Sequence, residues 1–310
     1  MTEAEAAARH WDATVIRPLS ERENAVYEIA LPDGSRAALR LHRRGYQSTR
    51  TIWSELWWCE QLAKAGLPVP RPVALPDGMM MVRMFSGRCI SVVEWVDGAA
   101  LGAAGVALSG GAREQARLHH ALGGLLARVH NASDRLKLPA EFTRHRWDAE
   151  GLVGESPTWG RFWEHAGLMP DQAATLCAAR DWMRDFLGAY EQNGADLGLI
   201  HADALRENVL VHDDRLTLID FDDAGIGFRL YDLGSVLSQN LYEPAYEEIR
   251  AALIEGYAAE RAVDADLVDV FTLARTLASV GWTMPRVDPA APVIQSHIAR
   301  AVMCAKRVIK

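Results

Sequence analysis

The residues with the clearest capacity for chemistry lie between positions 201 and 220. His201 and Asp203 follow a short apolar run, and Asn208 comes five positions after Asp203. A further stretch of apolar residues then ends at Asp220, in the acidic sequence DFDD. A carboxylate can take the proton of a hydroxyl group, and carboxylate and amide oxygens are suitable ligands for Mg²⁺. The pattern therefore favours phosphoryl transfer, which needs such a base and a magnesium ion.

The spacing of these residues matches that of a kinase catalytic loop. The sequence has H-x-D followed by Asn208, and Asp220 begins a D-F-D where a metal-binding D-F-G is expected. On this interpretation Asp203 is the catalytic base, and Asn208 and Asp220 hold Mg²⁺. The structural alternative is that Asp203 caps a turn, Asn208 closes a loop and the acidic run is a solvated tip. The spacing alone is only suggestive, but its place between a strand and a hairpin favours the functional interpretation.

Apolar runs around these residues predict the strands that hold them in place. They are LGLI at 197–200, VLV at 209–211 and LTLI at 216–219, and a polar tip separates the last two. Short runs divided by an Asp-rich turn are typical of a hairpin. We therefore expect the polar residues at the ends of buried strands, where a rigid scaffold can position a site.

Together these motifs resemble the aminoglycoside phosphotransferase and choline kinase superfamily, and most closely its branch of homoserine kinases and a bacterial stress-response kinase. HAD at 201–203 is similar to the family's H-G-D, DFDD at 220–223 to its D-F-D-D, and YDL at 231–233 to its Y-D-L. The resemblance implies that His201 and Asp232 brace the catalytic loop and that Asp222 lies near the substrate. The chain departs from the family at Ala202, where glycine is usual. We expect a mild effect unless the backbone there needs a positive φ.

A candidate phosphate-binding cation lies on an early strand. The sequence PDG at 32–34 predicts a turn between two antiparallel strands, and the second strand carries AALR at 37–40. Arg40 therefore stands where a kinase carries the lysine of V-A-I-K, and arginine can pair with phosphate as a bidentate fork. The alternative is a surface cation. No G-x-G-x-x-G precedes this strand, so the loop over the phosphates would be Glu23 to Ala25, with Asn24 as a contact.

A predicted helix over residues 48–65 carries the expected partner of Arg40. Apolar residues at 52, 56, 59 and 62 have helical spacing, and Gly66 ends the pattern. Glu55 lies on or near the same face. It resembles the kinase glutamate that orients the phosphate-binding cation, although a surface glutamate is the alternative.

The resemblance implies a protein-kinase-like α+β fold with two lobes. Strands at 79–84 and 89–96 complete an antiparallel sheet, and the backbone of Glu94 and Val96 would bind the adenine edge. We place the boundary near residue 97, with a small sheet lobe over the nucleotide phosphates at 1–96. The larger, mainly helical lobe at 97–310 would hold the catalytic loop, the metal site and the acceptor pocket. Further helices are predicted at 113–130, 171–193, 236–240, 246–259, 264–280 and 292–308.

The acceptor site is the least determined part of the sequence. Aromatic and cationic residues gather between 131 and 170, where the superfamily inserts substrate-specific structure, but a local aromatic core explains them equally well. The residues that could line the acceptor pocket are Trp159, Asp222, Arg275, Trp282 and Arg286. His119, His120 and His130 are expected to have packing or surface roles, because no carboxylate or cysteine stands at ligand spacing.

Composition narrows the class of protein. The 310 residues carry a net charge of −8, which argues against a broad nucleic-acid surface. The four cysteines include no C-x-x-C pair and are expected to be reduced thiols of a cytoplasmic protein. The start of the chain lacks a signal-peptide pattern, and no apolar run reaches the roughly 18 residues of a membrane span.

The sequence thus predicts an ATP-dependent kinase that moves the γ-phosphate to a hydroxyl of a small molecule, with ATP and Mg²⁺ as cofactors. An amino alcohol such as homoserine, or an aminoglycoside-like compound, is the favoured acceptor, and a homodimer is left open. One alternative is a Ser/Thr protein kinase of the stress-response type, and a second is a non-catalytic nucleotide-binding protein. A metal-dependent hydrolase that uses His201 and Asp203 is the weakest.

Overall fold

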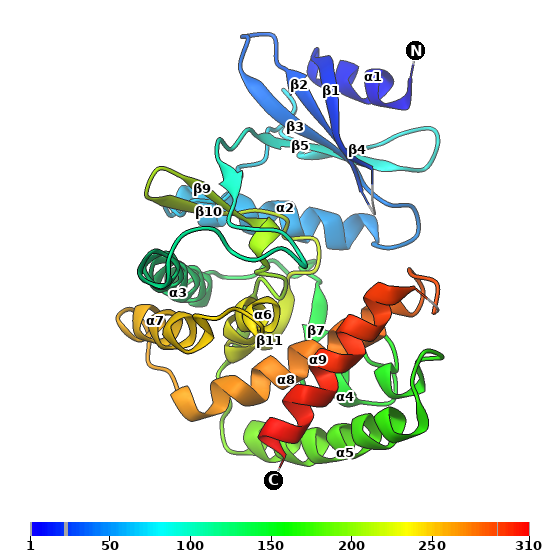
Figure 1. Cartoon of the computed structure of the whole chain (residues 1–310). Coiled ribbons are helices and arrows are strands. Elements are labelled where there is room, and N and C mark those ends of the chain that lie inside the picture. Colours follow the sequence, from blue (N-terminus) through cyan, green and yellow to red (C-terminus); the bar gives the residue numbers. More distant parts are fainter. Residues whose placement is uncertain (1, 22–23, 290, 310) are drawn as a thin grey trace. The chain divides into compact units, whose positions relative to one another are not determined.

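The computed structural model of the chain describes residues 2–21, 24–289 and 291–309, and Figure 1 labels its elements. The chain forms two compact units. Unit 1 comprises Met1–Ala99, Leu136–Arg144 and Leu210–Asp222, and unit 2 comprises Ala100–Arg135, His145–Val209 and Asp223–Lys310. Two later segments thus group with the first part of the chain, and the lobe boundary near residue 97 stays a prediction.

Unit 1 is built on a five-stranded antiparallel sheet with the order β1-β2-β3-β5-β4 (Figure 1). The strands are β1 (Thr14–Glu21), β2 (Ala25–Ala30), β3 (Arg36–Leu41), β4 (Met81–Arg83) and β5 (Cys89–Glu94). Successive side chains of a strand point to opposite faces, so Leu39 and Leu41 enter the core while Arg40 lies on the other face. The short helices α1 (Glu3–Ala8) and η1 (Arg9–Trp11) add Ala7 and Trp11 to this core.

The helix α2 (Thr49–Lys64) presents one functional side chain to the interior of unit 1. Ser48 caps its first turn by accepting a hydrogen bond from the Thr51 backbone, and Gly66 follows its end with a φ of 79°. The predicted apolar face is buried and includes Glu55. The predicted helix over 48–65 is therefore confirmed.

Unit 2 is mainly helical. Its longer helices are α3 (Ala112–Asp134), α5 (Pro170–Gln192), α6 (Leu230–Asn240), α7 (Tyr246–Ala258), α8 (Val268–Thr283) and α9 (Pro292–Val308). Shorter ones are α4 (Ala149–Val153), η2 (Phe162–Glu164), η3 (Arg206–Asn208) and η4 (Ala265–Leu267). A small sheet has the order β7-β11-β8, from β7 (His145–Trp147), β11 (Gly225–Phe228) and β8 (Leu197–Ile200). Glycine lets α3 and α7 approach closely, since a Cβ on Gly256 would lie 1.9 Å from the His120 carbonyl oxygen.

The predicted hairpin between the catalytic motifs is present as β9 (Val209–His212) and β10 (Arg215–Leu218). The short strand β6 (Ala99–Ala100) lies where the chain leaves unit 1. The predicted α+β class is confirmed, with the antiparallel sheet toward the N-terminus and the helices toward the C-terminus. None of the helices in the described ranges combines the length and apolarity needed to cross a membrane.

One helix begins earlier than the sequence pattern predicts. The predicted helix at 236–240 starts at Leu230, so the YDL motif forms its first turn. Gly234 and Ser235 weaken the local helical preference, but α6 is buried along almost its whole length, and burial in unit 2 overrides propensity. Asp232 is thereby held inside the protein on a rigid element.

Candidate active site

Four of the predicted site residues lie in unit 1 together with Arg144, which the sequence did not single out, and we call this group the Arg40 cluster. It comprises Arg40, Glu55, Arg144, Asp220 and Asp222. The Arg40 guanidinium donates to Glu55 Oε1 at 2.7 Å and to Asp220 Oδ1 at 3.0 Å. Asp222 Oδ1 lies 3.9 Å from the same guanidinium. The structure therefore brings together the predicted cation on β3, the predicted glutamate on α2 and the acidic segment after β10.

Electrostatics hold this cation charged in spite of its burial. Burial by itself would lower the pKa of Arg40, but the carboxylates of Glu55, Asp220 and Asp222 raise it above its ordinary value. The two carboxylates that it bonds differ in exposure. The Glu55 side chain is 4% exposed, whereas the Asp220 side chain is 45% exposed. Glu55 is thus a buried and fixed partner of Arg40, whereas the Asp220 carboxylate is accessible to other groups.

The acidic segment has an unusual backbone and an internal anchor. Asp220 has a φ of 62°, in the left-handed region that few residues other than glycine adopt. Arg144 donates to the carbonyl oxygens of Phe221 at 2.8 Å and Asp222 at 2.6 Å, and also to that of Thr51 in α2. These bonds tie the segment to α2. Sequence reasoning missed Arg144 as an anchor because nothing local distinguishes it from the neighbouring arginine at position 146.

Asp222, predicted near the substrate, is placed against the interior of unit 1. Its carboxylate accepts a hydrogen bond from the Gln47 side chain at 2.8 Å, and the residue is 7% exposed. Gln47 also accepts a bond from Arg144 at 3.1 Å. In this placement Asp222 stabilises its own segment, and a contact with the substrate stays a prediction.

The predicted nucleotide contacts on the sheet have different surroundings. Asn24 accepts a bond from the Arg43 backbone at 2.9 Å, whereas Glu23 lies outside the described residues. At the end of β5, the Glu94 N–H donates to the Arg71 carbonyl at 2.8 Å. Val96 follows in an irregular segment and is half-buried. Of the two predicted adenine contacts, Glu94 has thus already committed its backbone donor.

The second group of predicted site residues lies in unit 2, and we call it the Asp203 cluster. It comprises Asp203, Asn208 and Arg275. Asn208 Nδ2 donates to Asp203 Oδ2 at 2.8 Å and to the Asp203 carbonyl at 2.9 Å. Arg275 donates to Asp203 Oδ1 at 2.7 Å from helix α8. Both oxygens of the predicted base are therefore held by hydrogen bonds.

The loop that carries Asp203 is fixed by a buried carboxylate. Asp232 accepts hydrogen bonds from the backbone N–H groups of His201 at 2.9 Å and Ala202 at 2.6 Å. Its Oδ2 also lies 2.9 Å from His130 Nε2, and His130 Nδ1 lies 2.8 Å from the Tyr257 hydroxyl. This network holds the turn between β8 and Asp203 from the inside.

The charge state of this network follows from its surroundings. Burial alone would raise the pKa of Asp232, but the hydrogen bond from His130 and the His201 backbone bond keep it below the ordinary carboxyl value. Burial lowers the pKa of His130, against the effect of Asp232. We therefore assign a charged Asp232 and a neutral His130 that donates from Nε2.

The backbone at Ala202 has the positive φ that makes it costly to replace the family's glycine. Ala202 has a φ of 65°, so it lies where an L-residue is strained and the family's glycine is not. Its N–H donates to Asp232, and its carbonyl accepts from the Ser235 hydroxyl at 2.9 Å. Strain of about 1 kcal/mol is thus offset by bonds on both sides of the residue.

Of the five residues predicted for the acceptor pocket, Asp222 lies in the Arg40 cluster and the other four form two pairs. The Arg275 guanidinium stacks over the Trp159 ring at 4.7 Å while it bonds Asp203. The Arg286 guanidinium stacks over the Trp282 ring at 4.9 Å and donates to the Trp282 carbonyl. The first pair joins the Asp203 cluster. Arg275 and Asp203 are 72 positions apart in the chain, so no local sequence pattern predicts their contact.

Two histidines discussed as metal ligands have other partners. His119 Nδ1 lies 2.6 Å from the Gln115 carbonyl, and His130 is bonded at both ring nitrogens. Over the described ranges no group of three or more His, Cys, Asp or Glu side chains is arranged to hold a metal ion. The packing role predicted for His119 and His130 fits these contacts.

Comparison with known proteins identifies the family. The profile of the phosphotransferase enzyme family matches residues 15–267, and the chain belongs to this family. A homoserine kinase from Beijerinckia indica is 31% identical over 187 residues, which cover 60% of this chain and 52% of that enzyme. This chain therefore spans about half the length of that relative. An amicoumacin kinase from Bacillus subtilis is 24% identical over 288 residues, which cover 84% of this chain and 76% of that enzyme.

Solved structures share the fold. The structure of a microcompartment-associated aminopropanol kinase has a TM-score of 0.82 and 29% identity, and the match covers 98% of this chain and 96% of that one. A choline/ethanolamine kinase family protein from Mesorhizobium loti has a TM-score of 0.65 at 16% identity, with 99% and 94% covered. The predicted kinase-like fold and family resemblance are confirmed.

Proposed function

We propose that this protein is an ATP-dependent kinase that transfers the γ-phosphoryl group to a hydroxyl of a small molecule. The observation that carries the proposal is the Asp203 carboxylate, which Asn208 and Arg275 hold at both oxygens on a braced loop. The named relatives are kinases of homoserine, amicoumacin and aminopropanol. Homoserine and aminopropanol are both amino alcohols, which makes an amino alcohol the favoured acceptor.

Asp203 would act as the base. Its carboxylate orients the acceptor hydroxyl and takes its proton as the oxygen attacks the γ-phosphorus, and ADP leaves with the bridging oxygen. Fixed geometry matters here because a base must stay within hydrogen-bond reach of the proton that it removes. The bonds from Asn208 and Arg275 supply that fixation.

The side-chain oxygens suit a magnesium ion. Asn208 donates its amide nitrogen to Asp203, so its amide oxygen is the atom left for a metal. Asp220 offers a half-exposed carboxylate. Mg²⁺ is commonly bound by one or two protein oxygens together with the phosphates of its nucleotide, so each of these oxygens suits the ion. When bound, the ion would neutralise charge on the phosphates; a relative was solved with AMP-PNP and Ca²⁺.

Arg40 would contact the nucleotide phosphates. Its guanidinium is charged, is oriented by Glu55 and lies near the half-exposed Asp220. An arginine can bind phosphate through two parallel N–H groups, as the usual lysine cannot. Val96 is the candidate for the backbone donor to the adenine edge, because the Glu94 N–H is already bonded.

A direct assay of transfer tests the proposal. The purified protein is incubated with Mg·ATP and separate acceptors: homoserine, aminopropanol, choline, an aminoglycoside and a generic protein. We expect ADP and a phosphorylated small molecule, with loss of both when Mg²⁺ is removed and with Asp220→Ala. Phosphorylation of the generic protein alone would favour the protein kinase alternative. ATP binding without transfer to any acceptor would favour a non-catalytic protein.

A further inference from the structure

The catalytic loop carries a buried ion pair that the proposed mechanism does not use. Arg206 lies between the proposed base Asp203 and the proposed metal ligand Asn208, in the short helix η3. Its guanidinium donates to Glu243 Oε1 at 2.5 Å, and the two side chains are 4% and 7% exposed. Removing two charges from water is costly, so a pair in this position needs further hydrogen bonds to be stable.

The further bonds come from the end of α6 and from the loop that precedes α3. The Arg206 guanidinium also donates to Asn240 Oδ1 at 2.7 Å and to the Val106 carbonyl at 2.7 Å. Glu243 accepts a second hydrogen bond, from the Leu108 N–H at 3.1 Å. The ion pair therefore joins the catalytic loop to two other segments of unit 2.

The residue after Arg206 is bound to the same two segments. Glu207 accepts hydrogen bonds from the Ala104 N–H at 2.5 Å and from the Gln239 side chain at 2.9 Å. The Arg206 N–H in turn donates to Gln239 Oε1 at 2.8 Å. Two consecutive residues just before Asn208 are thus fastened to the rest of unit 2.

Different groups consequently hold the two ends of the catalytic loop. Asp232 binds the backbone N–H groups of His201 and Ala202, just before Asp203. The ion pair holds the loop just before Asn208. Loss of the ion pair should therefore leave the first end in place and release the end that carries the amide oxygen proposed for Mg²⁺.

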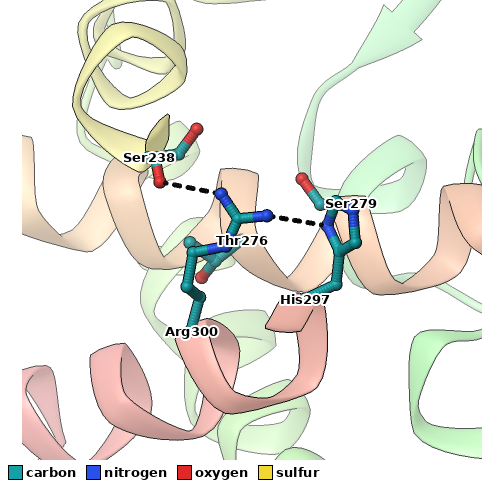
Figure 2. A pocket seen from close by; sticks show the side chains of 5 residues that line it. All are labelled: Ser238, Thr276, Ser279, His297 and Arg300. Atoms are coloured by element: carbon teal, nitrogen blue, oxygen red, sulfur yellow. Dashed lines mark hydrogen bonds between the residues drawn. The ribbon is translucent and has the colours of Figure 1, made fainter. Parts of the chain in front are cut away.

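A second arginine near the end of α6 has uncharged partners. It is Arg300 of α9, in the small hollow of Figure 2, and it donates to the Ser238 carbonyl at 3.5 Å and to His297 Nδ1 at 3.2 Å. Burial and the neighbouring arginines lower the pKa of His297 to about 4, so its ring is neutral near pH 7. An arginine can thus lie against α6 without a carboxylate, and packing alone does not explain the pairing of Arg206 with Glu243.

We propose that Arg206 and Glu243 are positioning residues for the metal site, because their ion pair holds η3 and with it the Asn208 amide oxygen. The inference rests on the proposed function and adds two residues that act through Asn208 and not on the substrate. Mg²⁺ demands near-ideal octahedral geometry, so a displaced ligand oxygen weakens its binding. Groups that orient a metal ligand commonly matter almost as much as the ligand itself.

Charge-matched variants separate positioning from stability. Arg206→Met leaves Glu243 buried without its cation and should lower the urea midpoint of unfolding. Adding Glu243→Gln removes the stranded charge and should restore most of the midpoint. The double variant still lacks the anchor of the loop, so we expect it to need about tenfold more Mg²⁺ for half-maximal turnover. With AMP-PNP present it should also bind Mn²⁺, measured by electron paramagnetic resonance, about tenfold more weakly than the wild type.

An ion pair elsewhere in unit 2 supplies the matched control. Arg250 on α7 pairs with Asp269 on α8 at 3.0 Å. The double variant Arg250→Met with Asp269→Asn should keep the Mg²⁺ requirement and the Mn²⁺ affinity within about twofold of the wild type, as expected for a distant site. Arg206→Lys keeps the charge but not the planar fork, and it should lie between the wild type and Arg206→Met.

The outcomes separate this inference from the proposed function. Wild-type Mg²⁺ requirement and Mn²⁺ affinity in the Arg206→Met, Glu243→Gln variant would overturn the inference, because the pair would then serve the fold alone. An equal loss in the control variant would also overturn it. If the double variant does not fold, Arg206→Lys decides, and unchanged metal binding in it contradicts the inference. If the wild type transfers phosphate to no acceptor, the proposed function fails and the Mn²⁺ comparison alone decides. Absence of Mn²⁺ binding by the wild type with AMP-PNP would overturn both.

Discussion

The two clusters surround their central charged group in opposite ways. The Arg40 cluster in unit 1 places one buried cation among carboxylates of unequal exposure, from Glu55 at 4% to Asp220 at 45%. The Asp203 cluster in unit 2 places one carboxylate between a cation and an amide, on a loop that Asp232 holds from inside. The first arrangement can exchange a partner when a nucleotide and a metal ion arrive, whereas the second holds a single group still.

This difference fits what each cluster would have to do. Phosphates and a metal ion must bind and leave in every cycle, so a half-exposed Asp220 is useful beside Arg40. A catalytic base must keep its position, since small displacements of a reacting group are costly in rate. The following variants test whether the Arg40 cluster governs nucleotide binding and the Asp203 cluster governs turnover.

Asp232→Asn should have the largest effect on stability. The change removes a charge that accepts from two backbone N–H groups and His130, and breaking such a buried network costs about 3 kcal/mol or more. We expect that loss in the free energy of unfolding, measured by urea at pH 7. The pKa of Asp232 is lowered in the fold, so its contribution is present above the ordinary carboxyl pKa and disappears as the pH falls through the folded value. Asp181→Asn, at an exposed pair, should change stability by less than about 0.5 kcal/mol.

Arg275→Met should reduce turnover more than binding. Without the bond to Oδ1, the Asp203 carboxylate is no longer fixed on that side, and we expect kcat to fall about 30-fold with KM for ATP changed less than about threefold. Arg275→Lys should recover part of the loss because it restores the charge. Equal losses in kcat and ATP affinity would show that Arg275 serves the fold and not the position of the base.

Glu55→Gln should show the reverse division. It weakens the contact that orients Arg40, so KM for ATP should rise about tenfold with kcat changed less. Glu60→Gln on the same helix, whose partner Lys64 is exposed, is the matched control. An unchanged KM for ATP in Glu55→Gln would contradict a role of Arg40 in nucleotide binding. It would also contradict the division of roles between the two clusters.

Ala202→Gly should have the smallest effect. Glycine adopts a φ of 65° without strain, so the free energy of unfolding should rise by about 0.5 to 1 kcal/mol. Ala127→Gly, in the middle of α3, should lower it by about 1 kcal/mol. A decrease for Ala202→Gly, measured by the same urea titration, would show that the strain at this position is not relieved.

Much of the scaffold could be predicted from local sequence, and the contacts within the clusters could not. The cap at Ser48, the apolar spacing in α2 and Gly66 are local signals, and they define that helix almost to the residue. The early start of α6 escaped prediction because burial, not propensity, forms its first turn. Arg144 and Arg275 also escaped as anchors, because each contacts its partner across more than 70 positions. Motif spacing predicts the type of chemistry, but long-range packing determines which cation pairs with which carboxylate.

The most direct test of the account is turnover by Asp203→Asn. Asparagine keeps the shape of the side chain and removes the proton acceptor, so kcat should fall by about 10³-fold while the affinity for Mg·ATP, measured by calorimetry, stays within about threefold. Asp213→Asn, at the tip of the β9–β10 hairpin, should behave like the wild type. Asp203→Asn that retained wild-type turnover would show that Asp203 is not the base, and the assignment of catalysis to unit 2 would fall with it.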